Sequence, residues 1–557
     1  MQHTTEELAD VIFPDVHETL ADLDKKYPPR NLPEGAEVTR FAPSPTGFLH
    51  TGSLFTALIA YTVAKRSQGV YFFRLEDTDQ KREVEGTGEQ LVDQLAFFGI
   101  KQDEGYMGDN RPEKGIYGPY VQSHRKEIYD VVIKEMIRRG RAYPCFCTEA
   151  ELDELRKVQE ANKVVPGYYG NYAKCRFRTV AEDIKLIKEG TPFVIRFRSE
   201  GDHTKFFQVK DLVRGTLSLP ENDQDIVIRK SDGLPTYHFA HLVDDHYMGT
   251  TVVTRGEEWL SSLPIHIELF EAIGWKAPKY AHLPVIMVND PQTGNRRKLS
   301  KRKDKEAAVS YFIQEGYPRL GILKYLMTIS NSNFEEWLRS NPRKPLLDFP
   351  FTFAKMSREG ALFDLPKLTD ISQNELAYES AKEISSEASE WADKFSPELA
   401  NFIKADPERF EAIMNIERDQ PKPRKDYSRY SDIYPKVRFF DSEEFAKFPK
   451  PFPFDPKLRK EDIKAILEGF SKYTGLEKPA DQWFGTVQEL GAKLGFAKSF
   501  KEYKADPAGF KGFAGDVASV IRVAETGSKN SPSLYYVLKI LGDEESKRRA
   551  LAALEAL

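Results

Sequence analysis

The segment EVTRF-APSPTG-FLHTGS, residues 37–53, decides the fold of the N-terminal half. Residues 37–41 predict a short strand, the Pro/Gly-rich residues 42–47 predict a loop, and an apolar helix is expected from about Ser53. The next apolar run, VYFFRL (70–75), predicts a second buried strand. A strand, a helix and a strand in this order form a βαβ unit, which implies a parallel sheet.

Later runs resume this α/β pattern after a long insertion, so the nucleotide-type fold is predicted to be split. The strand candidates are Ile226–Ile228, Thr236–Phe239, Thr251–Thr254 and Leu283–Met287. Past about residue 365 the strand signals fade, and helical stretches such as Lys460–Phe470 and Gly515–Ala524 dominate. The C-terminal third is therefore predicted to be helical.

Length and composition exclude several classes of protein. A chain of 557 residues predicts three to four domains at about 150 residues each. Hydrophobic residues make up 40%, and no run approaches the ~20 apolar residues that span a bilayer, so no membrane segment is expected. The acidic residues 1–33 do not resemble a secretion signal.

Three cysteines favour a reducing compartment, with the cytoplasm as the default. A net charge of -5 means that nucleic-acid binding would need local basic surfaces.

The residues HTGS (50–53) are placed at the predicted start of a helix, where free backbone N–H groups favour phosphate. His50 can donate hydrogen bonds to phosphate, and Gly52 allows close approach of the backbone. The structural alternative is an ordinary capped helix. Neither a P-loop motif nor a complete dinucleotide-binding glycine motif occurs, so another phosphate geometry is expected.

A basic segment, RRKLSKRK (296–303), follows the last strand candidate. Such a segment is usually solvated or touches nucleic acid. Together with HTGS about 250 residues earlier, KLSK (298–301) resembles the paired signatures of class I aminoacyl-tRNA synthetases. The stretches RFAPSPTG (40–47), RLEDTD (74–79) and YHFA (237–240) resemble the glutamyl and glutaminyl branch. RVAETG (522–527) and SPSLY (531–535) resemble the helical anticodon-binding end of bacterial glutamyl-tRNA synthetases.

The resemblance implies an α/β protein, with a class I Rossmann-type catalytic domain split by an insertion and followed by an all-α anticodon-binding region. The implied divisions are an N-terminal extension (1–34), the catalytic domain (35–114 and 236–280), an acceptor-binding insertion (115–235), a stem-contact region with the KLSKR loop (281–365) and a helical anticodon-binding region (366–557).

The implied activity is ATP-dependent activation of L-glutamate and transfer to the terminal adenosine of tRNA(Glu), and the sequence leaves tRNA(Gln) open as a second acceptor. In this chemistry the substrate carboxylate attacks ATP, so positioning and charge neutralisation do the catalysis. ATP would carry Mg²⁺. Lys298 and especially Lys301 would neutralise the leaving pyrophosphate. The resemblance assigns further ATP contacts to His50, Gly52, Ser53, Glu258, Trp259 and Ser300.

Glutamate would be held at its side-chain carboxylate by Arg40, Tyr237 and Arg255, with Ser44 nearby and Glu76 receiving the ammonium group. The structural alternative makes the two arginines partners of acidic neighbours in ion pairs, and the candidates are Glu76, Asp77, Asp79, Asp244 and Asp245. One departure from the family is His241, because relatives often carry Asn there. We assign it no role from sequence.

Cys145, Cys147 and Cys175 lie in the predicted insertion, where many bacterial relatives bind structural zinc. Phe177 stands where a histidine is often found, so Tyr169 or Tyr172 would have to supply the fourth ligand. Three reduced, buried thiols are the simpler alternative, and both remain open at this point.

Two rival functions have to be weighed. A noncatalytic tRNA-binding descendant would show degraded catalytic positions, which here are intact, and a small-molecule nucleotidyltransferase would not need the helical tail. Within that tail, Lys422, Arg424, Lys425 and Arg429 interleave with Tyr427, Tyr430 and Tyr434, as suits either RNA contact or a solvated linker. The family expectation for the oligomeric state is a monomer.

Overall fold

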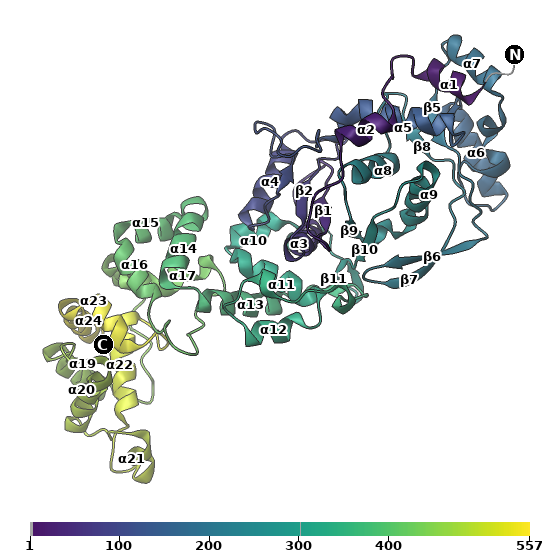
Figure 1. Cartoon of the computed structure of the whole chain (residues 1–557). Helices are drawn as coiled ribbons and strands as arrows, with labels where there is room; N and C mark the ends of the chain where they lie inside the picture. The colour runs from purple at the N-terminus through teal and green to yellow at the C-terminus, as the bar shows by residue number, and fades with distance from the viewer. Residues whose placement is uncertain (1–3, 301) are drawn as a thin grey trace. The chain divides into compact units, whose positions relative to one another are not determined.

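The computed structural model describes residues 4–300 and 302–557. They divide into two compact units. The first comprises the described residues up to Tyr311 together with Leu323–Asp364, and the second comprises Phe312–Ile322 and Leu365–Leu557. Figure 1 shows that strands occur in the first unit, whereas the C-terminal residues are helical. This confirms the predicted combination of an α/β part and a helical C-terminal part.

The first unit is built on parallel strands. Strand β1 (Val38–Phe41) pairs in parallel with β2 (Val70–Phe73), and β2 pairs in parallel with β3 (Glu104–Gly105). Helix α3 (Thr51–Arg66) connects β1 to β2 and packs on both (Figure 1). The predicted βαβ unit is therefore confirmed.

A second pair of parallel strands continues this arrangement. Strand β9 (Val252–Gly256) pairs in parallel with β10 (Lys279–Leu283). Strand β9 also lies beside β1, because the Thr251 amide donates to the Val38 carbonyl over 2.9 Å. Helices α8 (Tyr237–Tyr247) and α9 (Leu263–Ile273) accompany these strands.

The core explains why these segments adopt their structure. All four residues of β1 are buried, and α3 buries the apolar side chains Leu54, Phe55, Leu58 and Ile59. Each such side chain contributes about 1.5–3 kcal/mol when it leaves water. A strand and a helix that share an apolar face therefore stabilise each other.

Three strand predictions need correction. The segment Thr236–Phe239 is not a strand, because α8 begins at Tyr237 and buries Phe239, Ala240, Leu242 and Val243 at helical spacing. A run of four aromatic and β-branched residues is too short to distinguish the alternation of a strand from the 3.6-residue period of a helix. Ile226–Ile228 overlaps a true strand, β8 (Val227–Arg229), but β8 belongs to an antiparallel sheet. Leu283–Met287 spans a break between strands at Pro284, which has no amide hydrogen to donate.

Residues between β3 and α8 form a separate mixed region. Its antiparallel sheet has the order β4–β5–β8. A hairpin, β6 (Phe206–Asp211) and β7 (Gly215–Pro220), instead joins β10 through the pairing of Asp211 with Tyr280. The remaining elements of this region are α5 (Lys126–Arg138), β4 (Ala142–Cys145), α6 (Glu149–Ala161), α7 (Val180–Lys188) and β5 (Val194–Phe197), whereas α4 (Thr87–Phe97) lies between β2 and β3.

The region after β10 contains a small sheet with the order β12–β11–β13. Its strands are β11 (Ile286–Asn289), β12 (Arg296–Lys298) and β13 (Ala361–Leu362). The helices that follow are α10 (Val309–Glu315), α11 (Arg319–Ser330) and α12 (Phe334–Ser340). The boundaries predicted for the individual domains remain predictions.

The second unit is an assembly of helices around one apolar cluster that includes Ile384, Ile466, Val517 and Leu538. Its helices are α13 (Leu365–Tyr378), α14 (Ala381–Phe395), α15 (Pro397–Ala405), α16 (Pro407–Met414), α17 (Ile433–Val437), α18 (Ser442–Ala446), α19 (Lys460–Lys472), α20 (Ala480–Lys493), α21 (Phe500–Ala505), α22 (Ala514–Thr526), α23 (Leu534–Leu541) and α24 (Asp543–Glu555). The helices predicted at 460–470 and 515–524 are confirmed as α19 and α22.

The basic and aromatic segment at 422–434 differs from its first interpretation. Tyr427 and Tyr430 are buried, at 9% and 5% exposure, so they belong to the core and offer no stacking surface. Arg429 forms ion pairs with Glu315 and Asp432. Tyr427 and Tyr430 are therefore not open to base stacking, whereas contact of the exposed Lys422 and Lys425 with RNA phosphate stays a prediction.

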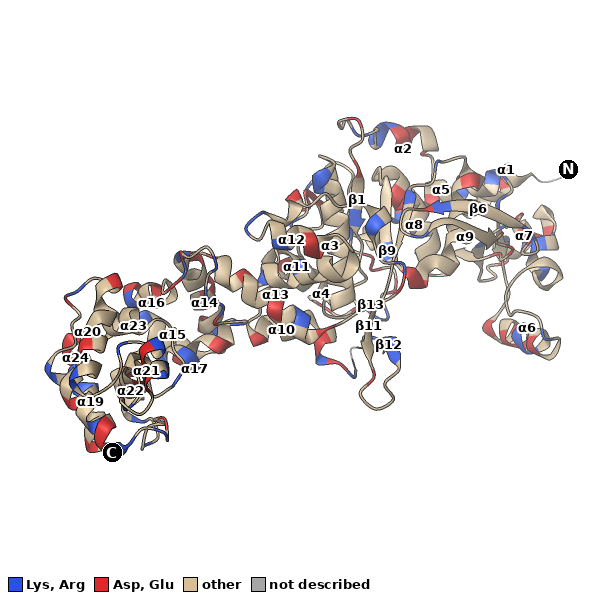
Figure 2. Ribbon diagram, turned by 90° about the horizontal axis from the view of Figure 1, so that it is seen from below, with Lys and Arg blue, Asp and Glu red and all other residues tan. Residues whose placement is uncertain are grey.

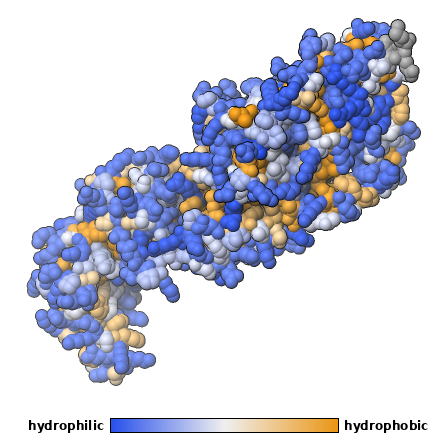
Figure 3. All heavy atoms as spheres, viewed as in Figure 1, coloured by the Kyte–Doolittle hydropathy of each residue, from blue (hydrophilic) through white to orange (hydrophobic). Residues whose placement is uncertain are grey.

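The surface carries both signs of charge. Figure 2 shows basic and acidic residues interspersed along the helices of both units, and Figure 3 shows a largely hydrophilic face with smaller apolar patches. Across residues 4–300 and 302–557, no helix has the length and apolar character needed to traverse a bilayer.

Residues 4–34 of the N-terminal extension form part of the first unit. Helices α1 (Thr5–Ile12) and α2 (Leu20–Lys26) both pack on α5. The buried Lys134 of α5 donates to the carbonyls of Phe13 and Val16 over 3.0 and 2.9 Å. Arg30 donates to both carboxylate oxygens of Glu104, at 2.7 and 3.0 Å, and its guanidinium lies 4.0 Å from the centre of the Tyr117 ring.

We predict that Arg30→Ala lowers the free energy of unfolding of the full chain by about 3 kcal/mol, because it leaves the half-buried Glu104 without its bidentate partner. Urea unfolding followed by circular dichroism measures this change. The control is Lys25→Ala, whose surface pair with Asp22 contributes less than about 0.5 kcal/mol. Equal stabilities of the two variants would show that the extension is not anchored through Arg30.

Candidate active site

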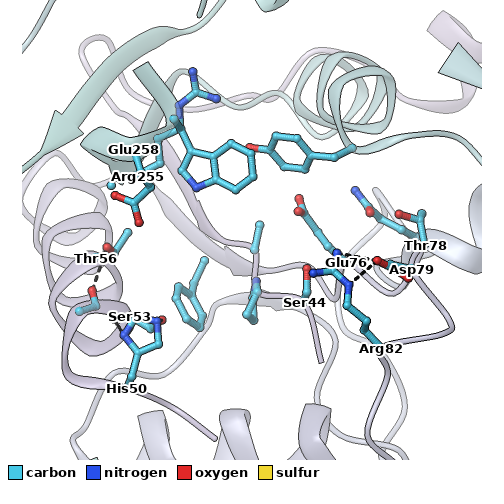
Figure 4. Close-up of a pocket in the computed structure, with 18 of the residues that line it drawn as sticks. Ser44, His50, Ser53, Thr56, Glu76, Thr78, Asp79, Arg82, Arg255 and Glu258 are labelled. Carbon is cyan, nitrogen blue, oxygen red and sulfur yellow. Dashed lines mark hydrogen bonds and ion pairs between the residues drawn. The ribbon is translucent and has the colours of Figure 1, made fainter. Parts of the chain in front are cut away.

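One large cavity, with a volume of about 1160 Å³, opens at the ends of β1 and β9 and at the start of α3. Figure 4 shows its side chains facing one another across an open space, with His50 and Ser53 on one side and Glu76 and Asp79 on the other. Of the residues predicted from sequence, the cavity is lined by Arg40, Ser44, His50, Gly52, Ser53, Glu76, Tyr237, Arg255, Glu258, Trp259 and Lys298.

The N-terminus of α3 is capped by a side chain. His50 is the N-cap residue with extended backbone, and its Nδ1 accepts a hydrogen bond from the Ser53 amide over 3.0 Å. Its Nε2 lies 2.8 Å from the Ser53 hydroxyl. A Cβ at position 52 would stand 3.1 Å from the imidazole, so the ring packs directly over Gly52. The imidazole thus caps the helix and also lines the cavity. The interpretation as a phosphate site and the alternative of an ordinary capped helix are therefore compatible.

A buried network of charges supports Arg40. Its Nε donates to Asp245 over 3.2 Å, and the same carboxylate accepts from Arg74 Nη1 over 2.8 Å. Arg74 also donates to Glu76 over 2.9 Å. Burial would raise the pKa of Asp245, but Arg40 and Arg74 outweigh it and hold that pKa well below its ordinary value. Burial raises the pKa of Glu76, although Arg74 and Arg40 oppose this shift.

A second buried carboxylate extends this network. Asp244 accepts hydrogen bonds from Arg125 Nε over 2.6 Å, from Gln122 over 2.8 Å and from the Tyr129 hydroxyl over 2.9 Å. Sequence reasoning named Asp244 and Asp245 only as ion-pair alternatives and did not find Arg125 or Tyr129. Adjacent acidic residues inside an apolar helical run, LVDDHY (242–247), were the available signal.

Arg255 has a different environment from Arg40. Its Nε donates to His282 Nε2 over 2.9 Å, and its Nη1 lies 2.9 Å from His266 Nδ1. Within the described residues no carboxylate lies in ion-pair distance of Arg255. The structural alternative of an acidic partner therefore applies to Arg40, which pairs with Asp245, and not to Arg255. Sequence reasoning missed His266 and His282, because histidines scattered along a chain carry no pattern.

The aromatic side of the cavity is formed by Tyr237 and Trp259, whose ring centres are 4.5 Å apart. Burial raises the pKa of Tyr237, and the nearby Arg255 opposes that shift. Trp259 remains 38% exposed and lines the cavity beside Glu258. The flat, partly open ring is suited to stacking.

The basic loop lies at the edge of the cavity. Lys298, at the end of β12, is exposed and its Nζ lies 3.2 Å from Glu258. Ser300 does not line the cavity, because its amide donates to Asp304 over 2.8 Å within the loop. Lys301 lies outside the described residues. The side chains of Arg40, His50 and Arg255 line one cavity.

The three cysteines come together. The Sγ atoms of Cys145, Cys147 and Cys175 all lie within 4.8 Å of one another. The Tyr168 hydroxyl lies 3.2 Å from Cys147 Sγ and 3.5 Å from Cys145 Sγ. The tyrosine beside the thiols is thus Tyr168, which the sequence analysis did not name, and a fourth ligand from Tyr169 or Tyr172 stays a prediction. The Tyr169 hydroxyl instead donates to the Val165 carbonyl over 2.7 Å.

Comparison with known protein families identifies the class to which this chain belongs. Residues 37–340 match the family described as tRNA synthetases class I (E and Q), catalytic domain, and residues 505–554 match the family described as anticodon binding domain. The chain belongs to the class I tRNA synthetases of the E and Q group.

Individual relatives narrow this class. The chain is 45% identical over 546 residues to the glutamate–tRNA ligase of Clostridium beijerinckii, covering 98% of both chains. It is 41% identical over 559 residues to the glutamate–tRNA ligase of Sorangium cellulosum, covering 95% of this chain and 96% of the relative. A crystal structure of a glutamate tRNA ligase from Elizabethkingia meningosepticum, in complex with its amino acid, superposes with a TM-score of 0.72 at 28% identity, covering 94% of this chain and 99% of that chain.

We predict that acid destabilises the full chain partly through His241. Burial lowers its pKa to about 4, although Asp245 opposes the shift. Because the unfolded histidine takes up a proton near pH 6.5 and the folded one does not, stability is present above pH 6.5 and is lost as the pH falls toward 4. The loss between pH 6.5 and 5 is on the order of 2 kcal/mol.

The measurement is the thermal midpoint of the full chain and of His241→Asn at several pH values between 5 and 7.5. The variant has no titratable ring at this position, so its midpoint is expected to fall less steeply. An identical slope in both proteins would exclude His241 as a source of acid sensitivity.

Proposed function

We propose that the chain is a glutamate–tRNA ligase that activates L-glutamate with ATP to glutamyl-adenylate and transfers it to the terminal adenosine of tRNA(Glu). The observation that carries this proposal is the single cavity that gathers the N-terminus of α3, Arg40 and Arg255. The likeness to glutamate–tRNA ligases over 98% of the chain supports the same activity.

The nucleotide would bind at the α3 end of the cavity. The N-terminus of a helix favours phosphate, and His50, Gly52 and Ser53 border it. The exposed indole of Trp259 and the carboxylate of Glu258 would contact the nucleoside. The loop that holds Lys298, Ser300 and Lys301 would supply positive charge, as the family resemblance implies. Because Lys298 is exposed and, within the described part of the chain, pairs only with Glu258, it is available to a phosphate.

Glutamate would bind at the sheet end of the cavity. Its side-chain carboxylate would meet Arg255 and Arg40, with the Tyr237 hydroxyl between them and Ser44 nearby. The buried Arg255 has no carboxylate partner among the described residues, so an anionic ligand would compensate its charge. The substrate ammonium would meet Glu76, whose carboxylate lines the same space.

The reaction needs no nucleophile from the protein. An oxygen of the glutamate α-carboxylate attacks the α-phosphorus of ATP, which enters as its magnesium complex, and pyrophosphate leaves with the electrons of the broken P–O bond. A ribose hydroxyl of the tRNA terminus then attacks the acyl carbon, and AMP leaves. The protein holds the reactants in line and places cations at the developing negative charge. These requirements match the residues that line the cavity.

We predict that the full chain catalyses ATP–pyrophosphate exchange that depends on both glutamate and added tRNA. Arg255→Gln should lower kcat/KM for glutamate by about 100-fold or more, because a charge-assisted carboxylate contact is lost. The matched control is Arg111→Gln, which removes an exposed arginine that pairs with Glu89 and Asp93. Absence of glutamate-dependent exchange in the presence of tRNA would instead support a noncatalytic tRNA-binding protein.

The tRNA would lie along the insertion and the helical C-terminal region, of which residues 505–554 match an anticodon-binding family. We propose that the enzyme acts as a monomer in the cytoplasm. Whether it also accepts tRNA(Gln) depends on anticodon contacts, and parallel charging of purified tRNA(Glu) and tRNA(Gln) distinguishes the two cases.

We also propose that the cluster of Cys145, Cys147 and Cys175 holds a structural zinc ion. Three sulfur atoms within 4.8 Å of one another match the donor set that zinc prefers, and the Tyr168 hydroxyl, 3.5 and 3.2 Å from the sulfurs of Cys145 and Cys147, would be the fourth group. Zinc would link β4 to the loop around Cys175 and so would contribute to folding rather than to chemistry.

We predict that the full chain, purified without chelators, contains about one zinc ion, because tetrahedral sites of this kind bind zinc tightly. Plasma mass spectrometry measures the metal. Cys147→Ser should lose the ion and Tyr168→Phe should weaken its binding, whereas the control Tyr169→Phe should retain it. A folded wild-type protein without zinc would favour the three reduced thiols.

A further inference from the structure

Arg255 is a buried cation that is held by uncharged groups. The side chain is 5% exposed, and both of its described hydrogen-bond partners are imidazoles, at 2.9 Å from Nε and Nη1. Its guanidinium also lies 4.9 Å from the centre of the Tyr280 ring, which is uncharged. Its Nη2 is buried and makes no hydrogen bond of acceptable geometry among the described residues. A buried charge of this kind is costly unless a ligand compensates it. Arg40, which is equally buried, differs because Asp245 neutralises it.

The hydrogen bonds of Arg255 fix the proton positions of its neighbours. A guanidinium can only donate, so His282 Nε2 and His266 Nδ1 must both be unprotonated acceptors. His282 therefore carries its proton on Nδ1, which lies 2.7 Å from Asp211. His266 carries its proton on Nε2, which lies 3.0 Å from His238 Nδ1. One arginine thus sets the tautomers of three histidines.

The surroundings keep these imidazoles neutral. His266 and His282 are both fully buried. Burial lowers the pKa of each of them, and for His266 the pKa lies well below its ordinary value. Protonation of either ring would remove an acceptor and would place a second cation against Arg255.

The fold supplies the anchor of this arrangement. In the parallel pair β9–β10, His282 stands opposite Arg255, so the two side chains share one face of the sheet. Asp211, at the end of β6, accepts from both the backbone amide and the ring of His282, at 3.1 and 2.7 Å. Its other oxygen accepts from the amides of Val213 and Arg214, which fixes the carboxylate.

We propose that Asp211, His282 and His266 are positioning residues that aim Arg255 into the substrate cavity while leaving its positive charge uncompensated for an anionic substrate group. The inference rests on the proposed role of Arg255 as a ligand of the glutamate side-chain carboxylate. The imidazoles do not touch the substrate. They provide acceptors without charge, which a carboxylate at the same position would not do.

A pair of variants of equal size tests the charge requirement. Asn at position 266 keeps a neutral acceptor close to the place of Nδ1, whereas Asp at the same position adds a carboxylate against Arg255. His266→Asp should raise KM for glutamate by about 10- to 100-fold, as expected when a charged contact is cancelled, and should leave KM for ATP within about threefold. His266→Asn should stay within about threefold of the wild-type KM for glutamate.

The anchor is tested in the same assay of tRNA-dependent ATP–pyrophosphate exchange with the full chain. His282→Ala should raise KM for glutamate, and His282→Gln should restore it, because the Gln carbonyl can replace Nε2 as an acceptor. His246→Asn is the control, since His246 is a largely buried histidine that stacks on Trp275 with ring centres 3.7 Å apart and has no described contact with Arg255. Equal KM values for glutamate in His266→Asp and His266→Asn would overturn the proposal.

A readout that does not depend on activity is the nitrogen spectrum of the full chain labelled with ¹⁵N-histidine, with assignment by the single variants. His282 is expected as the neutral Nδ1–H tautomer and His266 as the neutral Nε2–H tautomer at pH 7. Asp211→Asn should leave His282 as the Nδ1–H tautomer, because Arg255 still donates to Nε2 and the Asn side-chain carbonyl can still accept from Nδ1–H. A cationic ring at either position would overturn the inference, whereas absence of exchange in a wild-type protein with these tautomers would refute only the proposed function.

Discussion

The candidate site depends on the contact that places β9 beside β1. The hydrogen bond from the Thr251 amide to the Val38 carbonyl joins two segments that are more than 200 residues apart in sequence. It brings Arg40 and Arg255 to the same end of neighbouring strands, where Arg40 also approaches the Thr254 carbonyl at 3.4 Å. Ligands bind at the carboxyl ends of strands in open α/β sheets, and the cavity lies there.

The two buried arginines show how one site can treat equal charges differently. Arg40 lies in a network with Asp245, Arg74 and Glu76, in which each charge has a partner. Such a network fixes geometry but leaves little net charge for a ligand. Arg255 is held by neutral imidazoles, so its charge remains available. The difference follows from the acceptors that surround each guanidinium and not from the arginines themselves.

Much of the fold could be predicted from the sequence because the relevant signals are local. Apolar runs and the loop at 42–47 predicted β1, α3 and β2, and helical periodicity predicted α19 and α22. The residues at 236–239 were assigned wrongly as a strand because a window of four residues cannot separate a strand from the first turn of α8. The family resemblance implied the cysteine cluster, and the structure adds Tyr168 as its aromatic neighbour.

The sequence by itself determined which chemical groups the protein carries: a helix start with His50 and Gly52, two arginines that suit a carboxylate, and three thiols. Only the tertiary structure decided how those groups are used. The partners of Arg40 and Arg255 come from strands and helices distant along the chain, and the protonation of His266 and His282 depends on burial and on the direction of single hydrogen bonds. Neither burial nor the direction of a hydrogen bond is encoded in residue spacing, because both arise when separate segments pack together.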